Sequence, residues 1–151
     1  MGLLTEEHRA WIGTTEPPVT VEVTRRDIQK YAAATEQQQD RYRRGDEAPP
    51  MFVFNLFSTI PALADLRTDG LAATTTPGPP LPLPRIMAGG TELQIHRAIR
   101  AGDTLTGVRT LTDLYEKEGR TGPLIFLERV LRITTAAGEP VLDERQTAIA
   151  R

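Results

Sequence analysis

Residues 49–64 read PPMFVFNLFSTIPALA, a stretch in which nearly every side chain is apolar. Pro49 and Pro50 suit the first turn of a helix, where a missing N–H group costs little. A helix that is apolar around almost its whole circumference has to be buried on almost every side. Pro61 should kink or end the helix, because its ring clashes with the preceding turn. This stretch predicts one buried helix at the centre of the fold.

The sequence after this helix changes to the pattern of an antiparallel sheet. From Gly89 onward apolar side chains alternate with polar ones, and Arg97 and Arg129 are charged exceptions on otherwise apolar faces. Short turns that contain glycine are expected at residues 101–103, 118–122 and 137–139. Four strands joined by such turns predict a meander. The predicted fold class is therefore α+β, with a long antiparallel sheet wrapped around a central apolar helix.

Three other segments complete the predicted organisation. Residues 1–18 form a lead-in segment whose Trp11 and Ile12 should dock on the body of the protein. A short strand over 19–23 and a helix over 25–36 follow, with Thr24 at the N-cap. The proline-rich loop at 67–88 contains TTTPGPPLPLP at 74–84, which can form neither a helix nor a central strand. Loops of this length are usually functional or disordered.

Composition excludes several classes of protein. A chain of 151 residues fits a single domain. The 18 basic and 20 acidic residues leave a net charge of −2, whereas nucleic-acid-binding surfaces are strongly basic. There is no cysteine, which excludes disulfides and thiolate chemistry, and only His8 and His96 could supply imidazole to a metal. No signal peptide or membrane span is recognised, so the expected location is the cytoplasm.

Several motifs, in this order along the chain, resemble the hot-dog fold of MaoC-like dehydratases and enoyl-CoA hydratases. The most specific are GGTELQIHRAIRAGDTL at 89–105 and YEKEGRTGPLIFLER at 115–129. APPMF at 48–52 is similar to the family's opening of its central helix. The resemblance covers residues 11–150. Within the family, the chain is most similar to the N-terminal half-domain called fatty-acid-synthase-type-I-like dehydratase.

The catalytic signature of active members aligns without gaps on residues 31–44, YAAATEQQQDRYRR. Its first five positions agree, but its reactive positions do not. Gln37 stands in place of the family's aspartate, Gln39 in place of its asparagine and Tyr42 in place of its histidine. Hydration of an enoyl thioester needs a base for water and an acid for the α-carbon. A glutamine amide does not titrate, and a phenol has a reference pKa of about 10.

The resemblance therefore implies a subunit that keeps the fold and has lost the water-activating pair. It predicts a non-catalytic, acyl-CoA-binding subunit of a heteromeric enoyl-CoA hydratase, without a cofactor. A partner hot-dog subunit would supply the aspartate and histidine, in a heterodimer or heterotetramer with one continuous sheet. Gly89 and Gly90 would let a backbone N–H approach the thioester carbonyl, and Met51 and Phe52 would shape the acyl site. These four residues are the predicted substrate-binding positions.

Alternative interpretations remain open at this point. A self-sufficient hydratase or thioesterase would use Asp40, Asp65 or His96 as its reactive group, and an acyl-CoA or acyl-carrier binding module would have no activity. Gly89 and Gly90 could instead relieve crowding at the start of a strand.

Two arginines have two possible roles, and two aromatic residues are expected to have a purely structural role. Arg97 and Arg100 could meet the phosphates of CoA, but pairing with acids across strands is favoured. Tyr31 and Phe57 are expected in the core.

Overall fold

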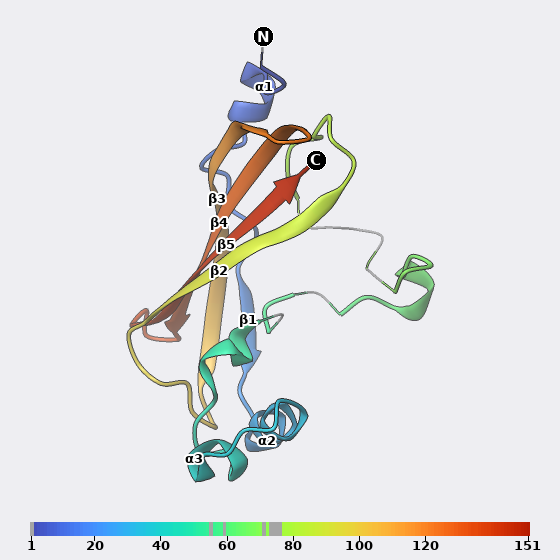
Figure 1. Cartoon of the computed structure of the whole chain (residues 1–151). Coiled ribbons are helices and arrows are strands. Elements are labelled where there is room, and N and C mark those ends of the chain that lie inside the picture. Colours follow the sequence, from blue (N-terminus) through green and yellow to red (C-terminus); the bar gives the residue numbers. More distant parts are fainter. Residues whose placement is uncertain (1, 55, 59, 71, 73–76) are drawn as a thin grey trace.

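Alternating apolar side chains build the five-stranded sheet at the centre of this protein (Figure 1). The computed structural model describes residues 2–54, 56–58, 60–70, 72 and 77–151. The strand order is β1-β3-β4-β5-β2, and every neighbouring pair is antiparallel. The strands are β1 (Val19–Glu22), β2 (Ile86–Ile95), β3 (Thr104–Gly119), β4 (Gly122–Thr135) and β5 (Pro140–Ala150).

Strands β3, β4 and β5 form the predicted meander, but β2 does not join it at the predicted place. β2 pairs with β5, with Leu93 opposite Glu144 and Ile95 opposite Leu142. The other side of β3 is occupied by β1, where Val21 lies opposite Leu105. The segment after β2 also turns toward β5, since the N–H groups of residues 96 and 97 both donate to the Val141 carbonyl. The prediction of a four-strand meander is therefore wrong for its first strand.

Three short α-helices precede the sheet's long strands: α1 (Glu6–Arg9), α2 (Arg25–Ala34) and α3 (Asp40–Arg43). Thr24 caps α2 as predicted, because its hydroxyl accepts a hydrogen bond from the Asp27 N–H at 3.1 Å. The buried side of α2 carries Ile28 and Ala32. α2 and α3 lie together at one end of the sheet, and α1 lies at the other end (Figure 1).

The predicted helix over residues 49–64 is wrong in type and extent for the described part of that stretch; residues 55 and 59 lie outside the described residues. The described residues contain a 3₁₀-helix, η1 (Pro50–Val53), followed by turns and a second one, η2 (Leu63–Asp65). The Phe54 N–H already bonds three residues back, to Met51 at 3.0 Å, and Phe54 then leaves the helical region with a ψ of 119°. Pro61 disfavours a helical conformation for the residue before it. Apolar composition alone did not distinguish this path from a regular helix.

Burial in this segment is divided rather than continuous. Phe52, Val53 and Phe57 are buried, as the apolar pattern predicted. Ile60 and Leu63, in contrast, are 96% and 86% exposed. The central segment is thus anchored by two buried side chains in η1, Phe52 and Val53, and by Phe57 in the turn that follows.

Two apolar clusters form the core on the same face of the sheet. The first packs α2 and η1 against the sheet, and the second packs the N-terminal segment and the proline-rich loop. The first cluster consists of Val23, Ile28, Ala48, Phe52, Val53, Phe57, Ile99, Leu105, Leu131, Ile133, Val141 and Leu142. The second cluster consists of Leu4, Leu111, Leu114, Ile125, Leu127 and Ala150, with Leu3, Trp11, Leu81, Leu83 and Ala148 packed against it.

The lead-in segment and the proline-rich loop meet each other. Trp11 packs on the second cluster as predicted, whereas Ile12 remains 39% exposed. His8 donates from Nε2 to the Pro80 carbonyl at 2.9 Å, so it links the two segments. Of the predicted stretch 74–84, residues 77–84 form no helix or strand, as their prolines predicted, and residues 74–76 lie outside the described residues. The predicted loop 67–88 ends earlier than expected, because β2 begins at Ile86. Among the described residues, no helix is long and apolar enough to cross a membrane.

Candidate functional site

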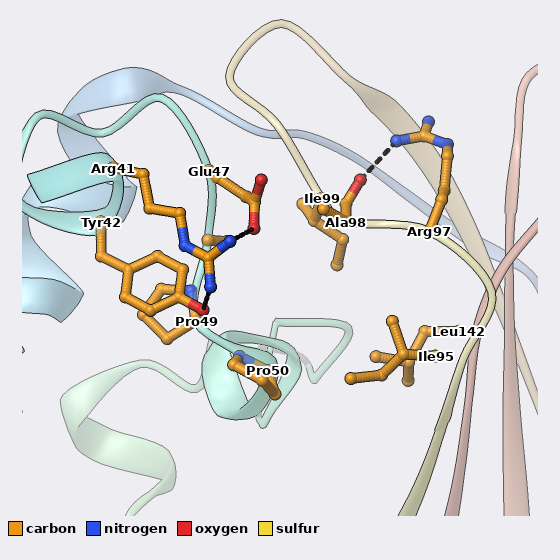
Figure 2. Close-up of a pocket in the computed structure, with 11 residues that line it drawn as sticks. Arg41, Tyr42, Glu47, Pro49, Pro50, Ile95, Arg97, Ala98, Ile99 and Leu142 are labelled. Atoms are coloured by element: carbon orange, nitrogen blue, oxygen red, sulfur yellow. Dashed lines mark hydrogen bonds and ion pairs between the residues drawn. The ribbon is translucent and has the colours of Figure 1, made fainter. Parts of the chain in front are cut away.

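A pocket of about 250 Å³ opens where α3, the Pro49-Pro50 turn and the end of β2 come together (Figure 2). Its walls combine apolar side chains of the first cluster with several charged groups. The lining residues are Arg41, Tyr42, Glu47, Ala48, Pro49, Pro50, Ile95, Arg97, Ala98, Ile99 and Leu142. Tyr42 is the only one of the predicted catalytic positions in this set.

Tyr42 lies on α3 and is 7% exposed. Its phenol oxygen accepts a hydrogen bond from the Arg41 guanidinium at 3.0 Å, and that guanidinium also lies over the Tyr42 ring, 4.7 Å from its centroid. The same Arg41 pairs with the Glu47 carboxylate at 3.3 Å, so Arg41 joins the phenol and the carboxylate (Figure 2). The phenol oxygen is thus engaged as an acceptor, a different arrangement from an imidazole ready to exchange protons.

The opposite wall is organised by an ion pair within the β2–β3 connection. Arg97 donates to both carboxylate oxygens of Asp103, at 2.9 and 3.2 Å, and to the Ala98 carbonyl at 2.7 Å. Burial raises the pKa of Asp103, but hydrogen bonds from Arg97 and from the Arg100 N–H outweigh it and hold this pKa below its ordinary value. The hydrogen bond to Asp103 raises the pKa of Arg97. Arg97 is therefore paired with an acid, as favoured, although within one connection and not across strands.

The two predicted glutamine positions do not converge on the pocket. Gln37 donates from its side-chain amide to the Thr35 hydroxyl at 3.2 Å, back toward the end of α2. Gln39 is exposed at the N-cap of α3 and its side chain makes no capping hydrogen bond. Tyr42 is consequently the one member of the degenerate motif that lines the pocket.

The predicted substrate-binding residues also lie outside the pocket lining. Gly89 and Gly90 are exposed at a bulge in β2. A Cβ at Gly89 would lie 3.0 Å from the Thr147 carbonyl oxygen and from the Ile149 side chain, whereas one at Gly90 would meet nothing within 4 Å. Crowding against β5 therefore accounts for Gly89. Gly90 has no such neighbour.

Met51 and Phe52 differ in their surroundings. Met51 is 39% exposed, while Phe52 is buried and packs edge-to-face with Tyr31, with ring centroids 5.6 Å apart. Phe57 belongs to the first cluster, as expected, and Tyr31 packs against it.

The alternative reactive groups are not among the residues that line the pocket. Asp40 and Asp65 are exposed, on α3 and η2 respectively. His96 hydrogen-bonds to Asp143 at 3.3 Å and is not among the lining residues. The part of the chain that the structure describes contains no group of three potential metal ligands.

Sequence reasoning missed Arg41 and Glu47 as pocket residues. In the sequence they belong to the charge run 40–47, which looks like an ordinary solvated surface. Two backbone contacts place this run at the pocket: residue 47 forms an isolated β-bridge with residue 100, and the Ala48 N–H donates to the Ile99 carbonyl. Both contacts draw the end of the charge run against the β2–β3 connection.

Comparison with known proteins identifies relatives of this chain. A mesaconyl-C(4)-CoA hydratase of Chloroflexus aurantiacus is 28% identical over 118 residues, which cover 78% of this chain and 42% of the relative. The chain therefore spans less than half the length of that relative. A UPF0336 protein of Saccharopolyspora erythraea is 29% identical over 146 residues, covering 95% of this chain and 90% of the relative.

Solved structures share the fold at low sequence identity. The HadBC (3R-hydroxyacyl-ACP dehydratase) complex of Mycobacterium tuberculosis superposes with a TM-score of 0.67 at 16% identity, covering 93% of this chain and 97% of the matched chain. The ChsH1-ChsH2 complex of the same organism gives a TM-score of 0.62 at 14% identity, covering 90% and 83%. The α+β hot-dog fold is thereby confirmed. Residues 10–144 match the model of the FAS1-like dehydratase domain region, and the chain therefore belongs to this family of MaoC-like hot-dog dehydratase domains.

Proposed function

We propose that this chain is the non-catalytic, acyl-CoA-binding subunit of a heteromeric enoyl-CoA hydratase. It would act as one hot-dog domain, and a second hot-dog subunit would supply the catalytic aspartate and histidine. The observation that carries this proposal is the arrangement of Tyr42. At the position of the family's histidine, the pocket holds a phenol that accepts from Arg41, which in turn pairs with Glu47.

The chemistry of hydration supports this interpretation. Addition of water to an enoyl thioester needs one group that takes a proton from water and one that delivers a proton to carbon. In the described lining of the pocket, the single carboxylate is Glu47, which is paired with Arg41, and no histidine is present. Such a pocket suits binding and shaping of a substrate better than proton transfer.

The sheet edge supports assembly with a second hot-dog subunit. β2 is an edge strand, hydrogen-bonded on one side to β5 only. It carries three exposed apolar side chains, Ile86, Met87 and Ile95, which are 64%, 44% and 50% exposed. Unpaired edges of this kind are suited to pairing with another strand. The HadBC and ChsH1-ChsH2 structures share the fold, and each of them is a complex.

The deciding experiment measures hydration of a panel of enoyl-CoA thioesters by the purified chain alone and by the chain mixed with a candidate hot-dog subunit. The candidate should carry the intact Asp-x-Asn-Pro-x-His motif. We expect activity in the mixture that neither component shows alone. Replacing the candidate's aspartate with asparagine should abolish this activity, while complex formation measured by gel filtration should persist.

The same assay separates the proposal from a self-sufficient enzyme. Turnover by this chain alone would contradict the non-catalytic role. If that turnover were lost in Glu47→Gln but retained in Asp40→Asn, the pocket carboxylate Glu47 would be the base. The matched exposed carboxylate of Asp40 controls for a general loss of negative charge on this part of the surface.

A further inference from the structure

A second pocket, of about 420 Å³, lies where the β3–β4 hairpin, the segment before β2 and the end of β5 come together. These segments lie at the same end of the sheet as α1, away from α2 and α3 (Figure 1). Leu142 of the candidate functional site and Arg151 of this pocket are separated by about 30 Å along the path of β5. The second pocket is therefore a separate site. Its lining residues are Leu83, Pro84, Arg85, Thr121, Gly122, Pro123, Leu124 and Arg151.

Two arginines of this second pocket are directly paired through their backbones. The Arg85 N–H donates to the Arg151 carbonyl at 3.2 Å, and the Arg151 N–H donates to the Arg85 carbonyl at 2.9 Å. Residues that exchange both hydrogen bonds lie directly opposite each other in an antiparallel pair. Their side chains therefore leave the sheet on the same face, with Cβ atoms about 5 Å apart. Two guanidinium groups thus line the pocket from neighbouring points.

Neither guanidinium has an acidic partner within the described part of the chain. The ion pairs found there involve neither Arg85 nor Arg151, and neither side chain makes a hydrogen bond to another described residue. The lining of the pocket is entirely neutral or basic. Like charges that lie directly opposite each other destabilise a pair of strands. The arrangement is therefore unfavourable on its own, and a bound anion would relieve it.

The acids nearest in the register do not reach this pair of arginines. Leu124 lines the pocket, and Glu118 lies opposite the preceding residue of β4 but projects from the other face of the sheet. On the face that carries Leu124, the first acid along β4 is Glu128, about 13 Å away. Its carboxylate already accepts hydrogen bonds from Tyr115 and Arg145.

The rest of the lining indicates what kind of anion would fit. A phosphate monoester carries a charge of about −1.5 to −2 and three acceptor oxygens, so it can engage two guanidinium groups at once. The Thr121 hydroxyl offers one further donor. Two leucines and two prolines complete the wall and present apolar surface, which suits the planar or apolar body of an organic molecule better than a free inorganic ion.

We infer that the second pocket binds a small organic phosphate monoester with a planar or apolar body. Arg85 and Arg151 hold the phosphate group, Thr121 donates to it, and the apolar wall contacts the body of the ligand. This inference goes beyond the proposed acyl-CoA-binding function and does not depend on it, because the two pockets lie at opposite ends of the sheet.

The test compares three probes: adenosine monophosphate, adenosine and inorganic phosphate. Dissociation constants for the full chain are measured by calorimetry at fixed ionic strength. Adenosine monophosphate should bind at least about tenfold more tightly than either of the other probes, which corresponds to about 1.4 kcal/mol. It should also raise the thermal midpoint of unfolding, because a ligand that binds only the folded state stabilises that state.

Variants of the paired arginines make the test specific. Arg85→Gln and Arg151→Gln should each weaken binding of adenosine monophosphate by about tenfold and leave adenosine unchanged, and Arg85→Lys should retain part of the affinity. Without ligand, Arg85→Gln should be at least as stable to urea as the natural chain, because it removes one of two like charges. Arg132→Gln removes an exposed positive charge elsewhere on the same face of the sheet and should change neither value.

Three results would overturn the inference. The first is the absence of binding of adenosine monophosphate at millimolar concentration. The second is affinity for this probe that survives both Arg85→Gln and Arg151→Gln, or that equals the affinity for adenosine, since the phosphate would then not be recognised by the arginines. The third is equal affinity for inorganic phosphate, which would mean that the apolar wall contacts no ligand.

Discussion

At the scale of single residues, Tyr42 stands where the family resemblance implies a histidine, and its contacts differ from those expected of a catalytic acid or base. Tyr42 is buried and held by Arg41, and Arg41 is held by Glu47. The phenol and the carboxylate are both bound by the same guanidinium, so the arrangement resembles a structural network more than a proton relay. The role of Tyr42 is then expected to appear in stability.

Tyr42→Phe should lower the free energy of unfolding by about 1 kcal/mol, because it removes one hydrogen bond and keeps the ring. Tyr42→Ala should cost about 3–5 kcal/mol, since it also leaves a cavity. Urea unfolding followed by circular dichroism measures both values. As a comparison, Tyr115→Phe removes a phenol hydrogen bond outside the pocket, one that Tyr115 donates to Glu128 at 3.0 Å. Equal losses in Tyr42→Phe and Tyr42→Ala would contradict the assigned packing.

The site could be predicted from the sequence only in part. Tyr42 was identified by alignment with the family motif, because the alignment over residues 31–44 has no gaps. Glu47 and Arg97 are fifty positions apart in the chain and meet through the contact between residues 48 and 99. A contact between residues so far apart in the chain cannot be predicted from a local sequence pattern. Gly89 and Gly90 were selected for their backbone freedom, but the register of β2 on β5 places them at a bulge outside the pocket lining.

At the scale of elements, the strands were predictable and the central turn was not. Period-two alternation is a local property, and β3, β4 and β5 therefore appear close to their predicted bounds. The stretch after Pro49 is apolar whether it forms a helix or an irregular buried turn, and its path depends on distant partners. Phe57 is one such case, because its ring lies directly over the backbone of Gly107 on β3.

Gly107→Ala should destabilise the protein by about 1–3 kcal/mol, because the new Cβ would lie 2.6 Å from the Phe57 ring and 3.0 Å from the Leu131 side chain. Denaturant unfolding measures this loss. Gly90→Ala is the matched control in another strand, where an added Cβ meets nothing within 4 Å, and it should leave stability nearly unchanged. A loss of the same size in both variants would mean that the strand backbone, and not the Phe57 contact, requires glycine.

At the scale of the whole molecule, the two edges of the sheet are unequal. β1 has four residues and β2 has ten, and β2 carries three exposed apolar side chains, Ile86, Met87 and Ile95, against Val19 on β1. Long apolar edges favour pairing with other chains, whereas short ones resist it. The partner subunit proposed above is therefore expected to bind along β2.

Met87→Lys should weaken association with a hot-dog partner by at least about tenfold, because it places a charge on the unpaired edge. Analytical ultracentrifugation of the mixture measures the effect. Glu22→Lys introduces the same side chain on β1, and it should leave association unchanged. Unfolding of the isolated chain should be similar for both variants, and a complex that tolerates Met87→Lys but not Glu22→Lys would assign the interface to the other edge.

The strand order has a consequence for how the chain acquires its structure. β3, β4 and β5 pair with sequence neighbours through short turns, whereas β1 joins β3 and β2 joins β5 across long intervening segments. Closing a longer loop costs more entropy, so local hairpins are expected to form before distant pairings. The interval from β1 to β3 is longer than the interval from β2 to β5, so β1 would be the last strand to pair. β2, the edge that a partner would cover, would pair before it. The surface offered to a second chain would therefore be complete before the opposite edge of the sheet closes.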